Sequence, residues 1–306
     1  MTEQLKICSF NCNGLHDYKK RKDVFDFIRE RKASIYFLQE THWKYEWENF
    51  IRSCWGFDCY ISGKESNKNG VAILLNNNFE YKIHNVLRDP NGCYLAIDIE
   101  FDGKKVSLVN LYGSSRGDEP EIFENVGNIL EQMDNENIIL GGDWNIVLDY
   151  KLDTRNRNSS AGRPRSRQKI IEMITLFELV DIWRHLYPEK KGYTWRRYNS
   201  FQQSRLDYFL ISESLLGDVK GLKVLSGYRS DHSMVFLALD SNTKKRARQF
   251  WKFNNALLKD IEYMQLIKQV IKDVKRQYVA LVYDMDKTDT IPDEDIQFRI
   301  NDQLFF

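Results

Sequence analysis

Residues 93–112 read CYLAIDIEFDGKKVSLVNLY, and this stretch decides which kind of fold the chain adopts. Two runs within it, Cys93–Phe101 and Lys104–Tyr112, alternate apolar and polar side chains as half-buried β-strands do. The dipeptide between them, Asp102-Gly103, accepts the positive φ angles of a tight hairpin turn. The sequence therefore predicts a β-hairpin here, and with it a fold that contains β-sheet.

Short apolar runs of the same strand character lie on both sides of the hairpin, and amphipathic stretches separate them. Besides the hairpin strands, Leu95–Phe101 and Val106–Tyr112, the predicted strands are Leu5–Phe10, Ile35–Leu38, Phe57–Ile61, Val71–Leu75, Ile138–Leu140, Leu206–Ile211, Leu222–Tyr228 and Met234–Leu239. The predicted helices are Tyr18–Arg31, Trp43–Cys54, Glu119–Asn135 and Gln168–Leu186. So many strands imply two sheets, and the interspersed helices favour an α/β sandwich.

Composition sets limits on the class of protein. The chain has 306 residues, of which 42% are hydrophobic, enough for one large domain or about two ordinary ones. Its net charge of +1 gives no global attraction to nucleic acid, so a polyanionic partner must meet a local group of basic residues. The five cysteines have neither disulfide nor zinc-site spacing, and no run of 18 apolar residues occurs. We expect an intracellular protein that is neither secreted nor inserted in a membrane.

The character of the chain changes after Asp240, so we predict a domain over residues 1–240 and a separate segment over 241–306. The basic run Lys244–Arg248 is followed by an aromatic string, Phe250–Asn255, and by a helical pattern. Apolar residues recur every three or four positions there, at Leu257, Ile261, Met264, Ile267, Ile271 and Val274. The last residues, Asn301–Phe306, carry aromatics without a stop signal, which suggests a chain cut within a longer polypeptide. The basic run fits a nuclear-import signal or a linker equally well.

Four strings supply the groups that metal-assisted phosphodiester hydrolysis needs: a cation site, a base near the attacking water and donors for the developing charge. They are Asn11-Cys12-Asn13-Gly14, Gln39-Glu40-Thr41-His42, Gly141-Gly142-Asp143-Trp144-Asn145, and Ser230-Asp231-His232 with Arg205-Leu206-Asp207-Tyr208 before it. Glu40 follows a buried strand, where a carboxylate oxygen suits Mg²⁺. Asp143 and Asn145 follow two glycines that allow a tight turn. Asp207, within an apolar strand, needs a partner such as His232.

Each string alone also has an ordinary interpretation. A lone glutamate is usually a surface acid or a helix cap, Gly-Gly-Asp is a common turn, and an aspartate beside a histidine is often a structural pair. Only the occurrence of all the strings together and in this order indicates a catalytic site.

In that combination, from about Leu5 to Leu239, the chain resembles the endonuclease/exonuclease/phosphatase superfamily. This superfamily includes exonuclease III, the abasic-site endonucleases, DNase I and the endonucleases of LINE-type retrotransposons. The resemblance implies a DNase I-like, four-layer α/β sandwich of two mixed β-sheets flanked by helices, here with a C-terminal helical extension. It also implies a metal-dependent phosphodiesterase.

The resemblance implies a role for each matching position. Glu40 would be the principal ligand of Mg²⁺, for which Mn²⁺ could substitute, with Asn11 and Asp231 beside the metal. Asp143 would position or deprotonate the attacking water, and Asn145 and Tyr112 would contact the phosphate. Asp207 would orient His232, whose role as base or as charge stabiliser stays open. Gly113-Ser114-Ser115 departs from the family, because many relatives have a proline and an asparagine after the tyrosine.

Two segments are predicted to bind double-stranded DNA. One is a run of basic residues without acids, comprising Arg155, Arg157, Arg163, Arg165, Arg167 and Lys169, for which a solvated flexible loop is the alternative. The other is the polar loop from Trp195 to Gln203, which includes Arg196 and Arg197 and matches a loop that probes the minor groove in relatives. A structural hairpin tip is the alternative for this loop. Thr194, Ser204 and Ser230 complete the predicted DNA-binding set.

The retrotransposon endonucleases give the better match within the superfamily. Ser204-Arg205-Leu206-Asp207 is similar to their Ser-Lys-Ile-Asp, whereas abasic-site enzymes have a tryptophan where Ser204 stands. The aromatic string after residue 249 resembles their connector to a reverse transcriptase, although Tyr283–Asp286 lacks the adjacent aspartates of a polymerase site.

We therefore expect a DNA endonuclease that nicks its target and leaves a 3′-hydroxyl for target-primed reverse transcription. It would be a monomer that acts in the nucleus after cytoplasmic synthesis, and element RNA would bind a missing C-terminal region. An abasic-site repair nuclease is the main alternative. A lipid or inositol phosphatase and a catalytically dead DNA-binding module are weaker ones.

Overall fold

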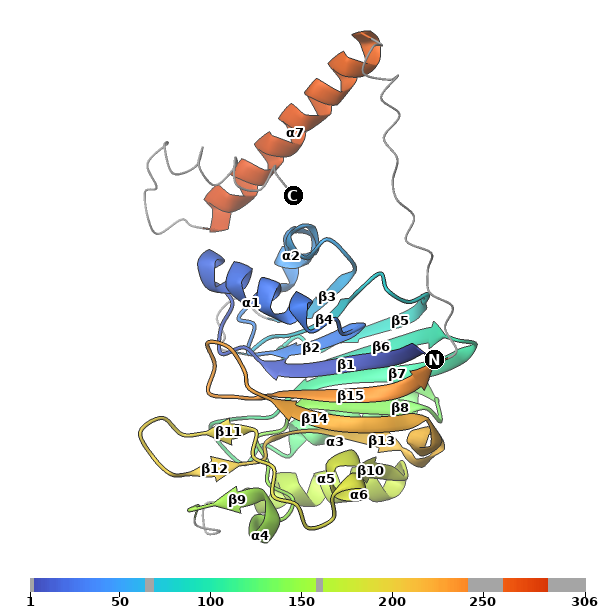
Figure 1. Cartoon of the computed structure of the whole chain (residues 1–306), viewed down its shortest axis with the longest axis vertical. Coiled ribbons are helices and arrows are strands. Elements are labelled where there is room, and N and C mark those ends of the chain that lie inside the picture. Colours follow the sequence, from blue (N-terminus) through green and yellow to red (C-terminus); the bar gives the residue numbers. More distant parts are fainter. Residues whose placement is uncertain (1–2, 64–68, 158–161, 242–260, 286–306) are drawn as a thin grey trace. The chain divides into compact units, whose positions relative to one another are not determined.

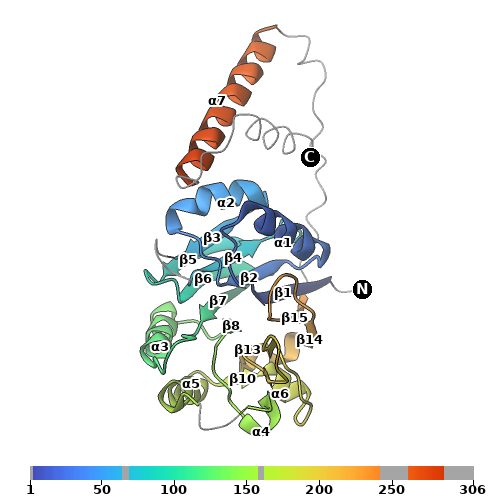
Figure 2. The same cartoon turned by 90° about the vertical axis from the view of Figure 1, so that its left-hand side faces the viewer.

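The computed structural model describes residues 3–63, 69–157, 162–241 and 261–285 (Figure 1). The chain forms two units, Met1–Ala247 and Arg248–Phe306. In the first unit two six-stranded sheets pack face to face, and helices cover their outer faces (Figure 2). The predicted four-layer α/β sandwich is thereby confirmed.

The first sheet carries the N-terminal strand next to the last strand of the fold. Its order is β14 (Val219–Leu225), β15 (Met234–Ser241), β1 (Glu3–Asn11), β2 (Ile35–Gln39), β4 (Val71–Leu75) and β3 (Cys59–Ser62). Only the β1–β2 pair is parallel among these strands. Helices α1 (Tyr18–Glu30) and α2 (Glu48–Trp55) lie on its outer side, α2 preceded by the 3₁₀ turn η1 (Tyr45–Trp47) (Figure 2).

The second sheet contains the predicted hairpin. Its order is β10 (Leu179–Asp181), β13 (Asp207–Ser212), β8 (Ile138–Asp143), β7 (Lys104–Tyr112), β6 (Tyr94–Phe101) and β5 (Lys82–Arg88), with β7 and β8 parallel. Asp102 and Gly103 join β6 to β7 with φ angles of 54° and 73°, as a two-residue hairpin turn requires. Outside this sheet lie α3 (Glu121–Met133) and α5 (Pro164–Leu176) (Figure 2).

Short elements lie at the two ends of β13, with the 3₁₀ turn η3 (Glu213–Asp218) following its last residue. The others are α4 (Tyr150–Asp153), α6 (Ile182–Leu186) and a small sheet of order β11 (Trp195–Arg196), β12 (Gln203–Ser204), β9 (Thr154–Arg155). The loop between β11 and β12 projects from the body of the fold (Figure 1).

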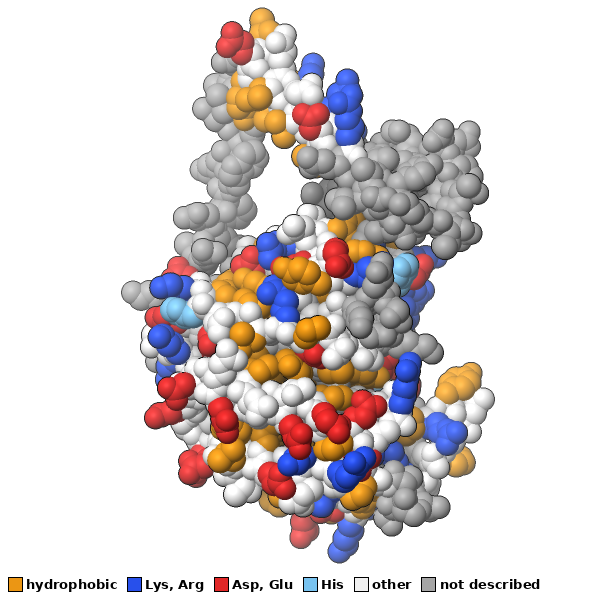
Figure 3. Space-filling model, turned by 180° about the vertical axis from the view of Figure 1, so that it is seen from behind, with side chains coloured by type: hydrophobic (Ala, Val, Ile, Leu, Met, Phe, Trp, Pro, Cys, Tyr) orange, Lys and Arg blue, Asp and Glu red, His pale blue; other side chains and the backbone are white. Residues whose placement is uncertain are grey.

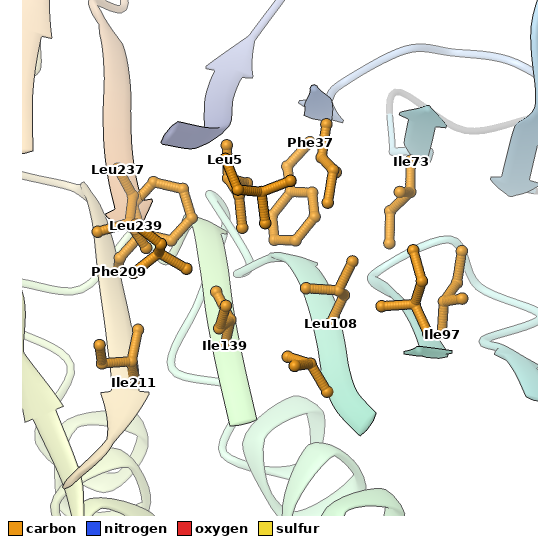
Figure 4. Packing of buried hydrophobic residues seen from close by; sticks show 14 of the residues in the cluster. Leu5, Phe37, Ile73, Ile97, Leu108, Ile139, Phe209, Ile211, Leu237 and Leu239 are labelled. Atoms are coloured by element: carbon orange, nitrogen blue, oxygen red, sulfur yellow. The ribbon is translucent and has the colours of Figure 1, made fainter. Parts of the chain in front are cut away.

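Apolar side chains from both sheets meet in the middle of the sandwich. Leu5, Phe37 and Leu237 from the first sheet face Leu108 and Phe209 from the second (Figure 4). These residues are at most 1% exposed, and burying each one contributes about 1.5–3 kcal/mol. The two sheets are therefore held as one body, which fixes the ends of their strands relative to each other.

A second core lies beneath α3 and α5 and anchors the loop that follows β8. Trp144 stacks between Phe123 and Tyr208, with ring centroids 6.1 and 4.8 Å away. Its indole Nε1 donates to the backbone oxygen of Tyr208 at 3.0 Å. Because Trp144 is fully buried, Asp143 and Asn145 on either side of it are held in place.

The predicted helix over Gln168–Leu186 is two helices, α5 and α6, with strand β10 between them. The chain leaves α5 at Leu176, turns through Glu178 at a φ of 49°, and adds β10 to the edge of the second sheet. Asp181 then caps α6 by accepting a hydrogen bond from the Arg184 amide. The apolar pattern continues across both elements, and sheet pairing overrides it. The last strand of the second sheet, β5, was not predicted, because it lies at an edge with mostly half-exposed side chains and a bulge.

The C-terminal unit contains α7 (Ile261–Met285), which confirms the predicted helical extension. Several of its apolar side chains are exposed, among them Leu266 and Val274. The basic run Lys244–Arg248, the string Phe250–Asn255, Leu257 and the final Asn301–Phe306 lie outside the described residues. Within the described ranges, no helix combines the length and apolar character needed to cross a membrane.

A buried ion cluster fastens the start of β13. The Arg205 guanidinium, 1% exposed, binds both carboxylate oxygens of Asp153, each at 2.8 Å, and the carboxylate of Asp181 at 2.6 and 3.1 Å. Arg184 also pairs with Asp153. The cluster thus joins the ends of α4 and β10 to the residue two places before Asp207.

Replacing Arg205 with Met should lower the free energy of unfolding by about 3–5 kcal/mol, because two buried carboxylates lose their main cation. Urea unfolding measures this change. Lys220→Met is the control, since its 3.0 Å pair with Asp240 is partly exposed and should contribute less than about 1 kcal/mol. Equal losses in the two variants would contradict the prediction.

Candidate active site

The strand ends of both sheets meet at one end of the sandwich. Asn11 ends β1 beside Gln39 at the end of β2, and Asp143 ends β8 between Tyr112 of β7 and Asp207 of β13. His232 comes just before β15, and its backbone pairs with Trp195 of the small sheet. The topology therefore gathers residues that lie more than 200 positions apart in the sequence.

Asn11 connects the first sheet to the second. Its amide Nδ2 donates to Glu40 Oε1 and to Asp143 Oδ2, each at 2.9 Å. Its Oδ1 accepts from the Asn13 amide at 3.0 Å. Glu40 and Asn13 both have positive φ angles, so these tight turns bring the loops after β2 and β1 together. Asn11 thus holds two carboxylates close to each other.

Asp143, His232 and Asp207 form a buried row. His232 Nδ1 lies 2.9 Å from Asp207 Oδ2, and its Nε2 lies 3.7 Å from Asp143 Oδ2. Asp143 also accepts from the backbone and side-chain amides of Asn145, at 2.9 and 3.1 Å. The predicted Asp207–His232 pair is therefore present, and the second ring nitrogen of His232 faces Asp143.

Charge and burial shift the pKa values in this row. Burial alone would lower the pKa of His232, but the charges of Asp207 and Asp143 more than offset it and raise the pKa to about 10. Burial raises the pKa of Asp143 to about 7, although the His232 charge acts in the opposite direction. At neutral pH His232 is consequently an imidazolium, which binds Asp207 through Nδ1 and has a proton on Nε2 to donate.

In EDTA, where no metal perturbs the ring, His232 should stay protonated at pH 8. Asp207→Asn should lower its pKa, because the variant removes the negative charge 2.9 Å from Nδ1. A pH titration of the ring signals by NMR measures both effects. Titration of the wild-type ring near pH 6.5, the value of an unperturbed histidine, would overturn this assignment.

The site contains groups that can bind a divalent cation: Asp143, Asp207 and His232 bring one ligand atom each to within 4.8 Å of one another, and two further acids lie nearby. Glu40 is half-buried at the end of its strand, and Asp231 is exposed beside His232, so both offer carboxylate oxygens, the ligand type that Mg²⁺ prefers. Asp231 is held by Trp195, whose Nε1 donates to its Oδ2 at 2.8 Å. The Asn11 amide presents its nitrogen to the carboxylates, so here it orients Glu40, and its role as a ligand stays a prediction.

Tyr112 is buried beside these groups. Burial raises its pKa well above the ordinary tyrosine value, and the charges of Glu40 and Asp143 act in the same direction. The hydroxyl is therefore neutral and able to donate at any pH near neutrality. The phosphate contact of Tyr112 stays a prediction.

The predicted DNA-binding residues divide into exposed and internal groups. Arg155, Arg196 and Arg197 are exposed. Thr194 and Ser204 are fully buried: Thr194 Oγ1 accepts from the backbone amides of Leu206 and Asp207, and Ser204 accepts from Arg157. Neither hydroxyl is open to a ligand in this conformation.

The remaining members of that set bind other parts of the protein. Ser230 donates to the Asn11 carbonyl at 2.7 Å. Arg163 and Arg167 donate to backbone carbonyls, and Arg165 pairs with Asp118. DNA contacts by these residues stay predictions.

The geometry agrees with a match between this chain and a known family. The match covers residues 8–232, from β1 to His232. This chain belongs to the endonuclease/exonuclease/phosphatase family. The superfamily assigned from the four strings is thus confirmed, and so is the assignment of the protein as a hydrolytic enzyme.

The proteins similar to this chain include nucleases and a transposon protein. It is 30% identical over 268 residues to the transposon TX1 149 kDa protein of Xenopus laevis, covering 86% of this chain and 20% of that protein. It is 26% identical over 264 residues to an exodeoxyribonuclease of Bacillus subtilis, covering 77% of this chain and all of that protein. The AP endonuclease LMAP of Leishmania major has a similar fold, with a TM-score of 0.67, 18% identity, and coverage of 78% and 88%.

Three supporting residues were not recognised in these roles from the sequence. Trp144 anchors the Asp143 loop in the second core, Thr194 fixes the backbone before Asp207, and Trp195 orients Asp231. The tryptophan between two polar residues in Gly141–Asn145 was a usable signal for the first. No local signal identifies the other two, because their partners lie 12 or more positions away.

Proposed function

We propose that this protein is a divalent-metal-dependent DNA endonuclease of a LINE-type retrotransposon. The buried Asp143–His232–Asp207 row, linked through Asn11 to Glu40, is the observation that carries the proposal. A buried base, a cationic donor and a separate carboxylate for a metal are the parts that hydrolysis of a phosphodiester requires.

The residues divide the chemistry among themselves. Asp143, with a pKa near neutrality, accepts a proton from the attacking water. The oxygen of that water then attacks the phosphorus atom. His232, as an imidazolium held by Asp207, donates from Nε2 to the phosphoryl oxygens as their negative charge grows. This division favours His232 as charge stabiliser over His232 as base.

Glu40 and Asp231 would hold the metal ion, with Asn11 beside them. When bound, Mg²⁺ supplies positive charge to the phosphate and the departing 3′-oxygen. Tyr112 would donate its neutral hydroxyl to the same phosphate. The Asn145 amide nitrogen donates to Gly113 O and to Asp143 Oδ2, which places it beside the base. To hold a phosphoryl oxygen, it would turn one of these two N–H groups to the phosphate.

The exposed loop between β11 and β12 is the proposed point of contact with the duplex. Tyr198 and Phe201 at its tip are each 85% exposed, and Arg196 and Arg197 lie next to them. Seen from behind, this projection shows hydrophobic and basic side chains together (Figure 3). Aromatic and arginine side chains on a projecting loop suit insertion into a minor groove.

The transposon relative supports the LINE-type role over a repair role. It is more similar in sequence than the bacterial exodeoxyribonuclease, at 30% against 26% identity. In the LINE-type role the product would carry a 3′-hydroxyl that primes reverse transcription. Chromosomal DNA would be met in the nucleus, and element RNA would bind a region outside this chain.

Nicking of a supercoiled plasmid tests the proposal. With Mg²⁺, the protein should convert the plasmid to open circles whose nicks a DNA polymerase extends directly, whereas EDTA should stop nicking and leave DNA binding intact. Absence of nicking, or nicks that need phosphatase treatment before extension, would reject it. A duplex with one abasic site serves as competitor, and strong preference for it would favour the repair nuclease.

A further inference from the structure

The loop after Tyr112 lies directly against the catalytic backbone. The Gly113 amide donates to Asp143 O at 2.8 Å, and the Asn145 side chain donates to Gly113 O at 3.0 Å. A Cβ at position 113 would lie 2.0 Å from the Trp144 carbonyl oxygen, so only glycine fits. The two residues that follow, Ser114 and Ser115, lie outside any helix or strand and include no proline to restrict them.

One arginine from a different segment holds this loop. The Arg163 Nη1 donates to the carbonyl of Ser114 and, at 2.8 Å, to that of Asn145, while its Nη2 donates to the carbonyl of Ser115 at 2.7 Å. One guanidinium therefore spans the loop after β7 and the loop after β8. The first of these loops begins directly after Tyr112, the last residue of β7, so the guanidinium also fixes the chain next to that side chain.

We propose that Arg163 is a positioning residue of the nuclease site, which keeps Tyr112, Ser115 and Asn145 in register for the phosphate. Only an arginine provides a planar fork that reaches three carbonyls at once, because a lysine ammonium is a single compact donor. The proposal rests on the proposed function. It reassigns a residue that the sequence placed among the DNA contacts.

The segment that carries Arg163 is itself fixed to the same loop. Asp118 accepts from the backbone amides of Arg165 and Ser166 at 3.0 and 2.8 Å, and from the Ser166 hydroxyl at 2.6 Å. Helix α5, which begins at Pro164, also packs beside α3 (Figure 2). Arg163 thus projects from an anchored helix start, which gives its guanidinium a defined position.

Burial separates Arg163 from an ordinary phosphate-binding arginine. It is half-buried, and desolvation lowers its pKa, with the charge of Arg157 acting in the same direction. Arg155, from the same basic run, is exposed. The two arginines therefore predict different kinetic effects when they are removed.

Single-turnover cleavage of a short duplex by Arg163→Ala and Arg163→Lys tests the assignment. We expect Arg163→Ala to slow cleavage at saturating DNA by about 10–100-fold, since small misplacements of reacting groups have effects of this size. Its Kd for DNA in EDTA, and the slope of log Kd against log salt, should stay as in the wild type. Arg163→Lys should give an intermediate rate.

Two further variants calibrate the result. Arg155→Ala should weaken binding and reduce the salt slope by about one, as loss of a phosphate contact does. Arg29→Ala removes an arginine that donates to two backbone carbonyls, of Cys54 and Trp55, between α1 and α2. It should lower the melting temperature without changing the cleavage rate of folded protein.

The outcomes are distinguishable. A reduced salt slope with an unchanged rate at saturation would make Arg163 a phosphate contact, and a lower melting temperature with wild-type kinetics would make it structural only. Either result overturns the proposal. If Arg163→Ala does not fold, the rate of Arg163→Lys decides. A wild-type protein without nicking activity would instead reject the proposed function.

Discussion

Asp143→Asn should reduce plasmid nicking by about 10²–10⁴-fold while the protein stays folded. The amide keeps the size of the side chain, but only one of its two terminal atoms is an oxygen. It can therefore accept either from the backbone amide of Asn145 or from the side chains of Asn11 and Asn145, which contact the two carboxylate oxygens at 2.9–3.1 Å. It cannot accept a proton from water. The loss should therefore appear at saturating Mg²⁺ and saturating DNA, and not as weaker binding.

The same substitution should preserve or raise thermal stability. Asp143 is fully buried near Asp207, and its raised pKa shows that the fold disfavours its charge. Linkage sets the sign: a carboxyl whose folded pKa lies above its unfolded pKa destabilises the fold as pH rises through that interval. An uncharged amide removes this effect, although it also gives up the attraction to His232.

Asp134→Asn is the matched control for Asp143→Asn. Asp134 is exposed at the end of α3 with a φ of 46°, a left-handed conformation that asparagine adopts readily. It should nick at the wild-type rate. Full activity in Asp143→Asn would remove Asp143 from the role of base, and unfolding of that variant would show that the buried charge is structural.

The parts of the fold that depend on local patterns could be predicted from the sequence. The β6–β7 hairpin follows from alternation and from Asp102-Gly103, and both are local signals. The boundary between α5 and β10 could not be predicted, because β10 exists only through pairing with β13 about 30 positions later. Edge strand β5 was missed for a similar reason: it has no strong alternation, and its partner β6 defines it.

For the candidate site too, the sequence predicts which residues take part, and their geometry comes only from the structure. The sequence places Asp207 and His232 in one constellation, and the structure brings them to 2.9 Å. The sequence does not show that a basic residue such as Arg163 points into the protein. A run of arginines has the same composition whether its side chains bind DNA or donate to backbone carbonyls of a neighbouring loop. Three-dimensional proximity to Ser114 and Asn145 is the missing information.

His232→Ala and Asp207→Ala should each lower the nicking rate by about 10²–10³-fold, and the double variant should be little worse than His232→Ala. The reason is that Asp207 acts through His232. Its Oδ2 contacts Nδ1 of the ring at 2.9 Å, while the opposite nitrogen faces Asp143. Once the ring is absent, the carboxylate has no protonated group to orient.

A double-mutant cycle of rates at saturating DNA measures this coupling. Additive losses, with a double variant slower by the product of the two factors, would mean that Asp207 contributes separately, for example by contacting the metal or the substrate. Asp207 Oδ1 is buried and without a hydrogen-bond partner in the described part of the chain, so such a second role has a candidate atom. Non-additivity would instead show that the carboxylate keeps His232 charged and oriented toward the phosphate. This is the function that its contact with Nδ1 of the ring predicts.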